Sequence, residues 1–283
     1  MTPCRLAATT PEVGTLDGPR RAPAPAGDVR LSVVVPAFRE VAHIAATVAR
    51  VREELGEVAA DGGLEVVVVD DGSGDGTADA ARAAGADVVL ELHPNQGKGA
   101  AVRAGMRAAS GRTRAFTDAD LSYAPHQILR LLEQVEAGWD LVVGDRYHEG
   151  STTLVEAGLL RRVGGRAINQ ATRAVLVGRH PDTQCGLKAL RGDVAEVLFG
   201  HTCIDGFAFD VELIHLAERL QLSLVEVPVE VVSSDRSTVH VARDALRLLG
   251  DLVRIRAAGR AGTYDLSAGE LAALSLGAPD PAE

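Results

Sequence analysis

The chain has 283 residues, of which 46% are hydrophobic and 24% charged, a composition that excludes a wholly disordered protein. Lys and Arg number 29 against 39 Asp and Glu, so the formal net charge is -10. This acidity argues against nucleic-acid binding, because phosphate contacts need a clustered basic face. The cysteines number 3 and lie far apart, so neither a disulfide framework nor a zinc ribbon is indicated, and a reducing compartment fits best.

The two ends of the chain are expected to lie outside the folded domain. Residues 1–29 are rich in Ala, Pro, Gly and Thr, which is typical of a disordered tail rather than of a signal peptide. Residues 30–260 form the expected domain, and 261–283 a C-terminal extension whose last part is disordered. No apolar run approaches the roughly 20 residues of a membrane span. We therefore expect a cytoplasmic protein, at most peripheral on the inner face of the membrane.

Short β-branched runs predict the strands of a buried sheet in the first half of the chain. They alternate with helical spacing of apolar residues, and each run ends in a polar loop. The predicted strands are 31–35, 64–69, 87–92, 113–117 and 140–143, with helices over 40–55 and 100–109. Strand, loop and helix in repetition indicate an α/β fold with a mostly parallel sheet, flanking helices and right-handed crossovers.

The second half is predicted to be mainly helical. Helices are expected over 159–177, 193–198 and 209–220, followed by a strand over 223–232 and a helix over 239–257. The stretch 239–260 has apolar residues at helical spacing and interspersed arginines, which resembles a basic amphipathic helix on a membrane surface. A helix packed on the core with solvated arginines has the same pattern, and we favour this second interpretation.

Charged residues follow several of the predicted strands. Asp70 and Asp71 end one strand, Lys98 lies in a glycine-rich loop, and Asp118 and Asp120 end another strand. Because the carboxyl ends of parallel strands meet at one edge, these groups should converge on one crevice. Two carboxylates at this spacing can bind Mg²⁺ or Mn²⁺ together with substrate phosphates, although the same spacing also occurs in solvated turns.

Several motifs in this order carry a resemblance to family 2 glycosyltransferases: 34–40 (VVPAFRE), 69–73 (VDDGS), 95–99 (NQGKG) and 118–120 (DAD). Downstream, 182–188 (DTQCGLK) and 209–213 (FDVEL) resemble the dolichyl-phosphate β-glucosyltransferase branch and related polyprenyl-phosphate transferases. The resemblance extends over residues 31–256 and is specific because the motifs keep their order and spacing. It implies a single domain of the glycosyltransferase A-type, Rossmann-like fold.

The resemblance implies a nucleotide-sugar site made from the motifs of the first half. The stretch from Pro36 to Glu40 would line the nucleoside, with Glu40 towards the ribose and Asp71 on the uracil edge. Lys98 would lie near the nucleotide. Without the other motifs, a helix-capping Glu, a strand-end Asp and a solvated loop lysine would be equally plausible descriptions of these residues.

The resemblance also implies a metal on the donor diphosphate. Asp118 and Asp120 would hold Mg²⁺ or Mn²⁺, Asp120 more directly. Members of this branch usually have a Ser-Lys dipeptide before the last helix, and this dipeptide contacts the donor diphosphate. This chain has 236–238 (RST) there, and Arg236 is the candidate substitute.

The acceptor side is expected to bind a phosphate. Arg146 matches an arginine of the family and, with Arg161 and Arg166, could clamp the acceptor phosphate. For Arg161 and Arg166 a solvated helix face is an equal alternative. Cys185 is expected to be a small packed residue beside the pocket and not a nucleophile.

The expected activity is inverting transfer of a hexose from a nucleotide sugar to a polyprenyl or dolichyl phosphate. UDP-glucose is favoured as donor and GDP-mannose is the alternative. A soluble transferase for hydroxyl acceptors would need a base, and Asp210, with Glu212 as second choice, is the candidate. The non-enzyme alternative is a nucleotide-sugar-binding scaffold. Expected partners are the donor, the acceptor, and either a membrane surface or a membrane protein, without nucleic acid.

Overall fold

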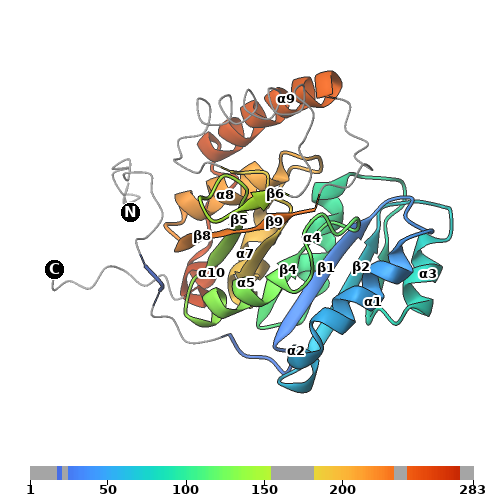
Figure 1. Cartoon of the computed structure of the whole chain (residues 1–283). Coiled ribbons are helices and arrows are strands. Elements are labelled where there is room, and N and C mark those ends of the chain that lie inside the picture. The colour runs from blue at the N-terminus through green and yellow to red at the C-terminus, as the bar shows by residue number, and fades with distance from the viewer. Residues whose placement is uncertain (1–17, 21–24, 154–181, 233–240, 275–283) are drawn as a thin grey trace, which may run out of the picture.

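A seven-stranded sheet forms the centre of the computed structural model, which describes residues 18–20, 25–153, 182–232 and 241–274. The strand order is β3-β2-β1-β4-β7-β5-β8, and β7 runs antiparallel to both of its neighbours while the other pairs are parallel. The predicted mostly parallel α/β sheet is confirmed (Figure 1). The strands are β1 (Leu31–Ala37), β2 (Leu64–Asp70), β3 (Val88–Glu91), β4 (Thr113–Phe116), β5 (Leu141–Asp145), β7 (Lys188–Arg191) and β8 (Leu224–Pro228), and a small second sheet pairs β6 (Thr152–Thr153) with β9 (Glu230–Val231).

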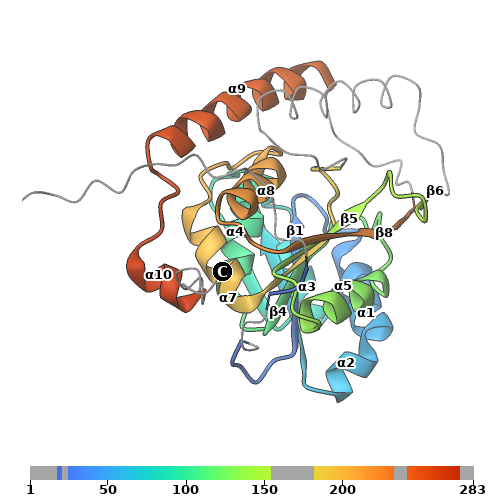
Figure 2. The same ribbon diagram turned by 90° about the vertical axis from the view of Figure 1, so that its left-hand side faces the viewer.

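Helices cover both faces of the sheet, because successive side chains of a buried strand point to opposite faces. In β1, Val33 and Val35 pack in one hydrophobic cluster and Val34 in the other. Figure 2 shows the resulting layers. The first cluster includes residues of α1 (Ile44–Glu54), α2 (Gly56–Ala60), α3 (Thr77–Ala83) and α5 (Gln127–Glu136); the second includes residues of α4 (Lys98–Ala108), α7 (Gly192–His201), α8 (Phe209–Arg219) and α9 (Val241–Arg260), and lies beside α10 (Ala268–Ala273).

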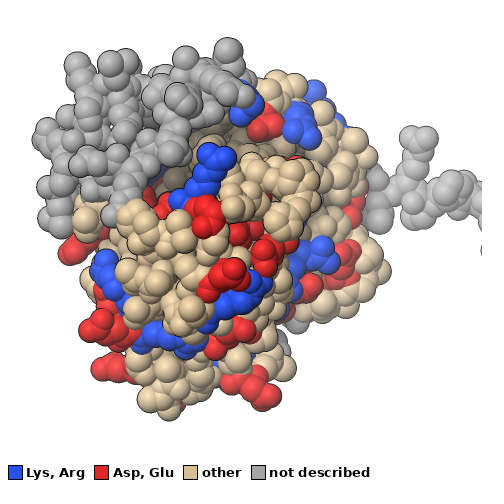
Figure 3. Space-filling model, turned by 90° about the vertical axis from the view of Figure 1, so that its right-hand side faces the viewer, with Lys and Arg blue, Asp and Glu red and all other residues tan. Residues whose placement is uncertain are grey.

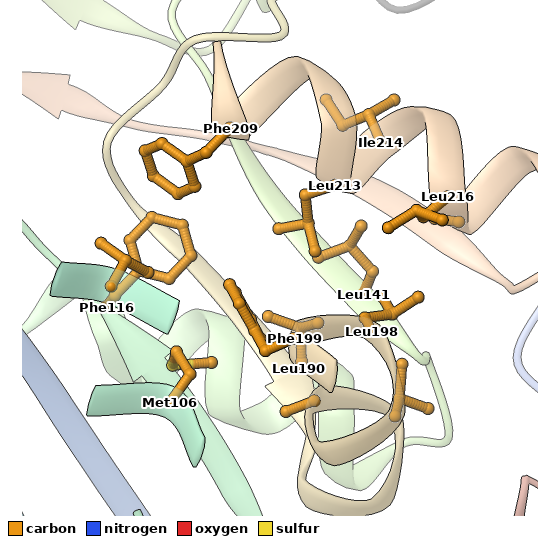
Figure 4. Close-up of a cluster of buried hydrophobic side chains, with 14 of the residues drawn as sticks. Met106, Phe116, Leu141, Leu190, Leu198, Phe199, Phe209, Leu213, Ile214 and Leu216 are labelled. Carbon is orange, nitrogen blue, oxygen red and sulfur yellow. The ribbon is translucent and has the colours of Figure 1, made fainter. Parts of the chain in front are cut away.

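The second cluster packs the start of α8 against the end of β4. The rings of Phe116 and Phe209 lie 5.7 Å apart between centroids and are tilted by 52° (Figure 4). Both side chains are buried. Since Phe209 begins α8, this contact fixes the position of the next residue, Asp210, relative to the end of β4.

The helix α9 packs on the core through one face and exposes apolar residues on another. Leu248, Leu252 and Ile255 are buried in the second cluster, so this face of the helix packs on the core, as the favoured interpretation predicts. Such packing does not test whether the opposite face meets a membrane. Leu249 and Val253 are nevertheless 44% and 64% exposed. Across the described part of the chain, a helix with the length and apolarity of a membrane span is not found.

Residues expected outside the domain contact its core. Arg20, from the expected tail, forms an ion pair with buried Asp140 at 2.7 Å and donates a hydrogen bond to the carbonyl of Leu274. Tyr264 and Leu274, from the expected C-terminal extension, are fully buried. The packed core therefore reaches beyond the expected limits of 30 and 260.

One side of the molecule carries charges of both signs in alternation. Figure 3 shows acidic and basic side chains interspersed over the side on which α1 and α3 lie. Several of them form ion pairs, such as Arg52 with Asp87 at 2.7 Å and Arg82 with Asp79 at 3.0 Å. Exposed pairs of this kind contribute little to stability. The described residues of this side present no broad patch of one sign.

Candidate active site

The strands β1, β2, β4 and β5 all end at one edge of the sheet. The first three are parallel neighbours, and β7 runs antiparallel between β4 and β5. The strand β7 therefore begins where β4 and β5 end, and its first residue, Lys188, pairs with Phe116 and Val143. This edge carries the predicted site residues that follow β2, β4 and β5.

The turn after β4 presents the predicted metal-binding carboxylates. Thr47 Oγ1 donates a hydrogen bond to the carbonyl of Ala119 at 2.8 Å, which ties the turn to α1. The backbone N–H and the hydroxyl of Ser122 both donate to Asp120 Oδ1 at 2.9 Å. The structure thus holds Asp118 and Asp120 on one fixed turn, as the sequence predicted.

Asp118 is contacted on both carboxylate oxygens. Lys98 Nζ lies 2.5 Å from Asp118 Oδ1, and the two side chains are 20% and 29% exposed. A Cβ on Gly186 would stand 2.3 Å from Asp118 Oδ2, so glycine alone fits there without a shift. Burial lowers the pKa of Lys98, but Asp118, Asp210 and Asp120 outweigh it, so this pKa lies above its ordinary value.

Asp71 organises the glycine-rich loop before α4. Its carboxylate accepts hydrogen bonds from the side-chain amide of Asn95 and from the backbone N–H groups of Gln96 and Gly97, each at 2.8 Å. Its main-chain carbonyl also accepts from Asn95. The contact of Asp71 with a nucleobase stays a prediction, whereas its engagement with this loop is a finding.

A second segment, 203–206, packs on the same loop. Gly97 has a φ of +112°, and a Cβ on it would stand 2.5 Å from the carbonyl oxygen of Asp205. The backbone N–H of Gly99 donates to that oxygen at 2.7 Å. Glu212, the second candidate base, accepts hydrogen bonds from the N–H groups of residues 203 and 204 at 2.8 and 2.9 Å. Its carboxylate therefore holds this segment in place.

Asp210, the first candidate base, is paired with a buried lysine. Lys188 Nζ lies 2.6 Å from Asp210 Oδ1 and also donates to the carbonyl of Cys185 at 2.6 Å. The Lys188 side chain is fully buried. Burial raises the pKa of Asp210, and the ammonium groups of Lys188 and Lys98 reduce this rise without cancelling it, so the pKa stays above its ordinary value. A paired carboxylate of this kind is a poor starting point for a general base.

Arg146 follows β5 and grips Asp182 through two parallel hydrogen bonds. Arg146 Nε lies 2.6 Å from Asp182 Oδ2, and Nη2 lies 2.7 Å from Oδ1. Asp182 is buried, and Arg146 is 35% exposed. Burial favours a higher pKa for Asp182, but the hydrogen bonds from Arg146 outweigh it and the pKa is lowered. Such a pair fixes the guanidinium at the edge of the site.

The remaining residues predicted for the site lie in or beside β1, in the buried core, or outside the described residues. Pro36 lies in β1 opposite Val69, and the backbone N–H of Glu40 donates to Thr77 Oγ1 at 3.0 Å just beyond that strand. Cys185 is buried, and burial raises the pKa of its thiol to about 11, which agrees with a packed and unreactive residue. Three further predicted residues lie outside the described residues: Arg161, Arg166 and Arg236.

The donor set at the edge of the sheet fits a hard divalent cation. Asp118 and Asp120 offer carboxylate oxygens, the ligands that Mg²⁺ and Mn²⁺ prefer. Within the described ranges, His, Cys, Asp and Glu side chains do not gather in threes or more to hold a metal. Among the described residues, a cation would therefore have this pair alone, and oxygens of water or of a substrate could complete its coordination.

Sequence reasoning assigned no role to Lys188, Asp182 or Gly186. All of them lie in the segment 182–188 that carried the resemblance, so their position was signalled. The partner of Lys188, Asp210, is 22 residues away along the chain, and the partner of Asp182, Arg146, is 36 residues away. Asp118 is 68 residues from Gly186. No local pattern in the sequence could therefore reveal these contacts.

A family model described as Glycosyl transferase family 2 matches residues 32–199, more than half of the chain. The chain belongs to glycosyltransferase family 2. The geometry of the site thus belongs to a glycosyltransferase, and the expected glycosyltransferase A-type fold is confirmed by solved structures.

Relatives of this family 2 glycosyltransferase include lipid-phosphate enzymes. A dolichyl-phosphate β-glucosyltransferase of Drosophila melanogaster is 33% identical over 80% of this chain and 74% of its own length. A polyprenol monophosphomannose synthase of Mycolicibacterium smegmatis is 36% identical over 71% of this chain and 76% of its own. Glucosyl-3-phosphoglycerate synthase of Mycobacterium tuberculosis, solved with Mn²⁺ and UDP, shares the fold with a TM-score of 0.63, 23% identity and coverage of 81% and 80%.

Proposed function

We propose that this chain transfers a hexose, with inversion, from a nucleotide sugar to a polyprenyl or dolichyl phosphate, and that the donor is UDP-glucose. The observation that carries the proposal is the group of Asp118, Asp120 and Lys98 at the end of β4. The name of the Drosophila melanogaster relative supports both the glucosyl group and the lipid phosphate.

The donor diphosphate is the group that this carboxylate pair would serve. Asp118 and Asp120 would hold Mg²⁺ or Mn²⁺, which supplies positive charge to the leaving diphosphate when bound. Lys98 lies beside them and adds an ammonium group to the same region. Preorganised charge of this kind stabilises a leaving group without reorganisation during the reaction.

The acceptor is proposed to be a phosphate because the site needs no base for it. The second pKa of a phosphate monoester is about 6, so the acceptor is already anionic near neutral pH. Its oxygen attacks the anomeric carbon as the bond from that carbon to the diphosphate breaks, and the bonding electrons leave with the diphosphate. No proton has to be taken up, which agrees with the pairing of Asp210 to Lys188.

Arg146 is proposed to bind the acceptor phosphate. Asp182 holds the Nε and Nη2 atoms of its guanidinium, so Nη1 is the remaining edge for a phosphate oxygen. The partial exposure of Arg146 leaves it accessible from solvent. Asp182 would then act as a positioning residue.

A mannosyl donor is the second candidate. It is favoured by the 36% identity to the polyprenol monophosphomannose synthase. A donor panel decides the matter: the purified chain is assayed with UDP-glucose and GDP-mannose against a short polyprenyl phosphate, with Mg²⁺, Mn²⁺ or excess EDTA. We expect metal-dependent turnover of UDP-glucose. Transfer to a hydroxyl acceptor alone would refute the lipid-phosphate assignment, and binding without turnover would favour the scaffold alternative.

We also propose that the exposed face of α9 brings the enzyme to the membrane that holds the acceptor. Leu249 and Val253 lie among exposed arginines of the same helix. A Cβ on Gly206 would lie 3.5 Å from Asp251 Oδ2, so α9 adjoins the segment that packs on the Lys98 loop. Figures 1 and 2 show the helix lying across one end of the molecule. Each arginine near an anionic surface would add about 1 kcal/mol, falling with salt.

Co-sedimentation with anionic vesicles tests this surface. The double variant Leu249→Ser, Val253→Ser should bind vesicles less than the wild type. The matched control is Leu271→Ser, which alters a leucine of α10 that is 37% exposed. Failure of the wild type to bind vesicles at low ionic strength would refute the surface and favour a membrane partner protein.

A further inference from the structure

The two lysines of the chain both lie at the active site. Lys98 and Lys188 are the lysines among 29 Lys and Arg residues, and each pairs with an aspartate at the end of the sheet. An ammonium group is a compact charge on a flexible stem, whereas a guanidinium grips a carboxylate with a fixed fork. Lysine therefore suits a position at which a positive group has to change its partner.

The two lysines differ in how freely their side chains can change partner. Lys188 is fully buried and bonded to both Asp210 and a backbone carbonyl, so it is fixed. Lys98 is 20% exposed and pairs with Asp118. Its backbone is held at the start of α4 by the loop that Asp71 organises, so a change of partner needs only rotation of the side chain.

Lys98 and a divalent cation would compete for the same carboxylate. Lys98 occupies Asp118 Oδ1, and Gly186 is packed against Oδ2. A cation at Asp118 would also stand next to the ammonium group, and like charges at such distances repel strongly. Among the described His, Cys, Asp and Glu residues the carboxylate pair has no third protein ligand, so these residues offer a cation little to offset this repulsion.

We propose that Lys98 exchanges Asp118 for an oxygen of the donor diphosphate, and that this exchange makes metal binding depend on the diphosphate. Without donor, the ammonium group neutralises Asp118 and keeps the cation weakly bound. With donor, the diphosphate becomes the partner of Lys98 and Asp118 is released to the cation. The inference rests on the proposed function, because it requires a nucleoside diphosphate donor.

Binding of Mn²⁺ to the purified chain tests the exchange without any assay of turnover. Free Mn²⁺ is measured by electron paramagnetic resonance during titrations with and without UDP. For the wild type we expect UDP to raise the affinity for Mn²⁺ by about tenfold or more, and by linkage Mn²⁺ must raise the affinity for UDP equally. Lys98→Met should bind Mn²⁺ alone about tenfold more tightly. UDP should then raise the affinity for Mn²⁺ by a smaller factor than in the wild type, and the gain that remains comes from the diphosphate oxygens that coordinate the cation.

Two further variants make the test specific. Lys98→Arg keeps the charge but grips Asp118 with a fork, so its affinity for Mn²⁺ should stay weak even with UDP. Arg107→Met removes a charge from an exposed position of the same helix, so it should behave as the wild type. Circular dichroism spectra of the variants report whether each one is folded.

The outcomes separate the inference from the proposed function. Equal Mn²⁺ affinity of the wild type with and without UDP would overturn the exchange, and so would an unchanged Mn²⁺ affinity in folded Lys98→Met. Failure of UDP to bind the wild type in the presence or absence of Mn²⁺ would instead overturn the proposed donor.

Discussion

Gly186 is a position at which one methyl group should disable the metal site. A Cβ there would stand 2.3 Å from Asp118 Oδ2 and 3.3 Å from Oδ1. Carbon and oxygen atoms that touch are normally about 3.3 Å apart or more, so the Asp118 carboxylate would have to withdraw by about 1 Å. The substitution Gly186→Ala therefore moves a proposed metal ligand without removing it.

The expected effect is large on activity and small on stability. A displacement of about 1 Å in an active site can cost about 100-fold in rate, so kcat/KM should fall by about that factor. The displaced atoms are the tip of a side chain that is 29% exposed. The free energy of unfolding should therefore change by less than about 1 kcal/mol, since the loss of one partly exposed ion pair is small.

Steady-state kinetics and urea unfolding measure the two effects. Gly200→Ala is the matched control, because nothing lies within 4 Å of a Cβ on Gly200 in α7. It should keep wild-type activity and gain about 0.5–1 kcal/mol of stability. Wild-type kcat/KM and metal dependence in Gly186→Ala would refute the reasoning about Asp118.

Three further predictions follow from the same contacts. Asp120→Ala and excess EDTA should each abolish transfer while Tm stays near that of the wild type, and full turnover in EDTA would contradict the metal assignment. Asp71→Ala leaves the N–H groups of Gln96 and Gly97 without their carboxylate acceptor. The free energy of unfolding in urea should therefore fall by about 2 kcal/mol. The donor KM should rise more than kcat falls, and an unchanged KM would contradict the role of Asp71 in donor binding. Because the folded-state pKa of Asp182 is lowered, its charge stabilises the fold above the unfolded-state pKa of about 3.9 and this contribution is lost as pH falls through the folded-state pKa. Asp182→Asn should thus cost about 2 kcal/mol at pH 7, less than for a fully buried pair, and progressively less below about pH 4; a cost independent of pH would refute this account.

Local patterns in the sequence were sufficient for the first half of the fold. The valine runs of β1 and β2 are buried on both faces, and the alternation with helices left a parallel sheet as the natural solution. The same rule placed Asp71 and Asp118 at one edge. The predicted strands and helices of this half agree with the structure to within a few residues, although α2, α3 and α5 were not named in advance.

The short strand β7 was missed because its sequence carries little local signal. It has 4 residues, Lys188–Arg191, and begins and ends with a basic residue. Such a segment becomes a strand because β4 and β5 offer unpaired edges on either side. Its insertion is what buries Lys188 beside Asp210.

The sequence by itself therefore determined the strands of the seven-stranded sheet other than β7, the edge at which the charged groups gather and the family. Only the tertiary structure decided which charges pair: Lys98 with Asp118, Lys188 with Asp210 and Arg146 with Asp182. It also decided that Tyr264 belongs to the core. The physical reason is that strand and helix formation follow from neighbours along the chain, whereas an ion pair depends on which distant segments the packing of the core brings within a few ångströms.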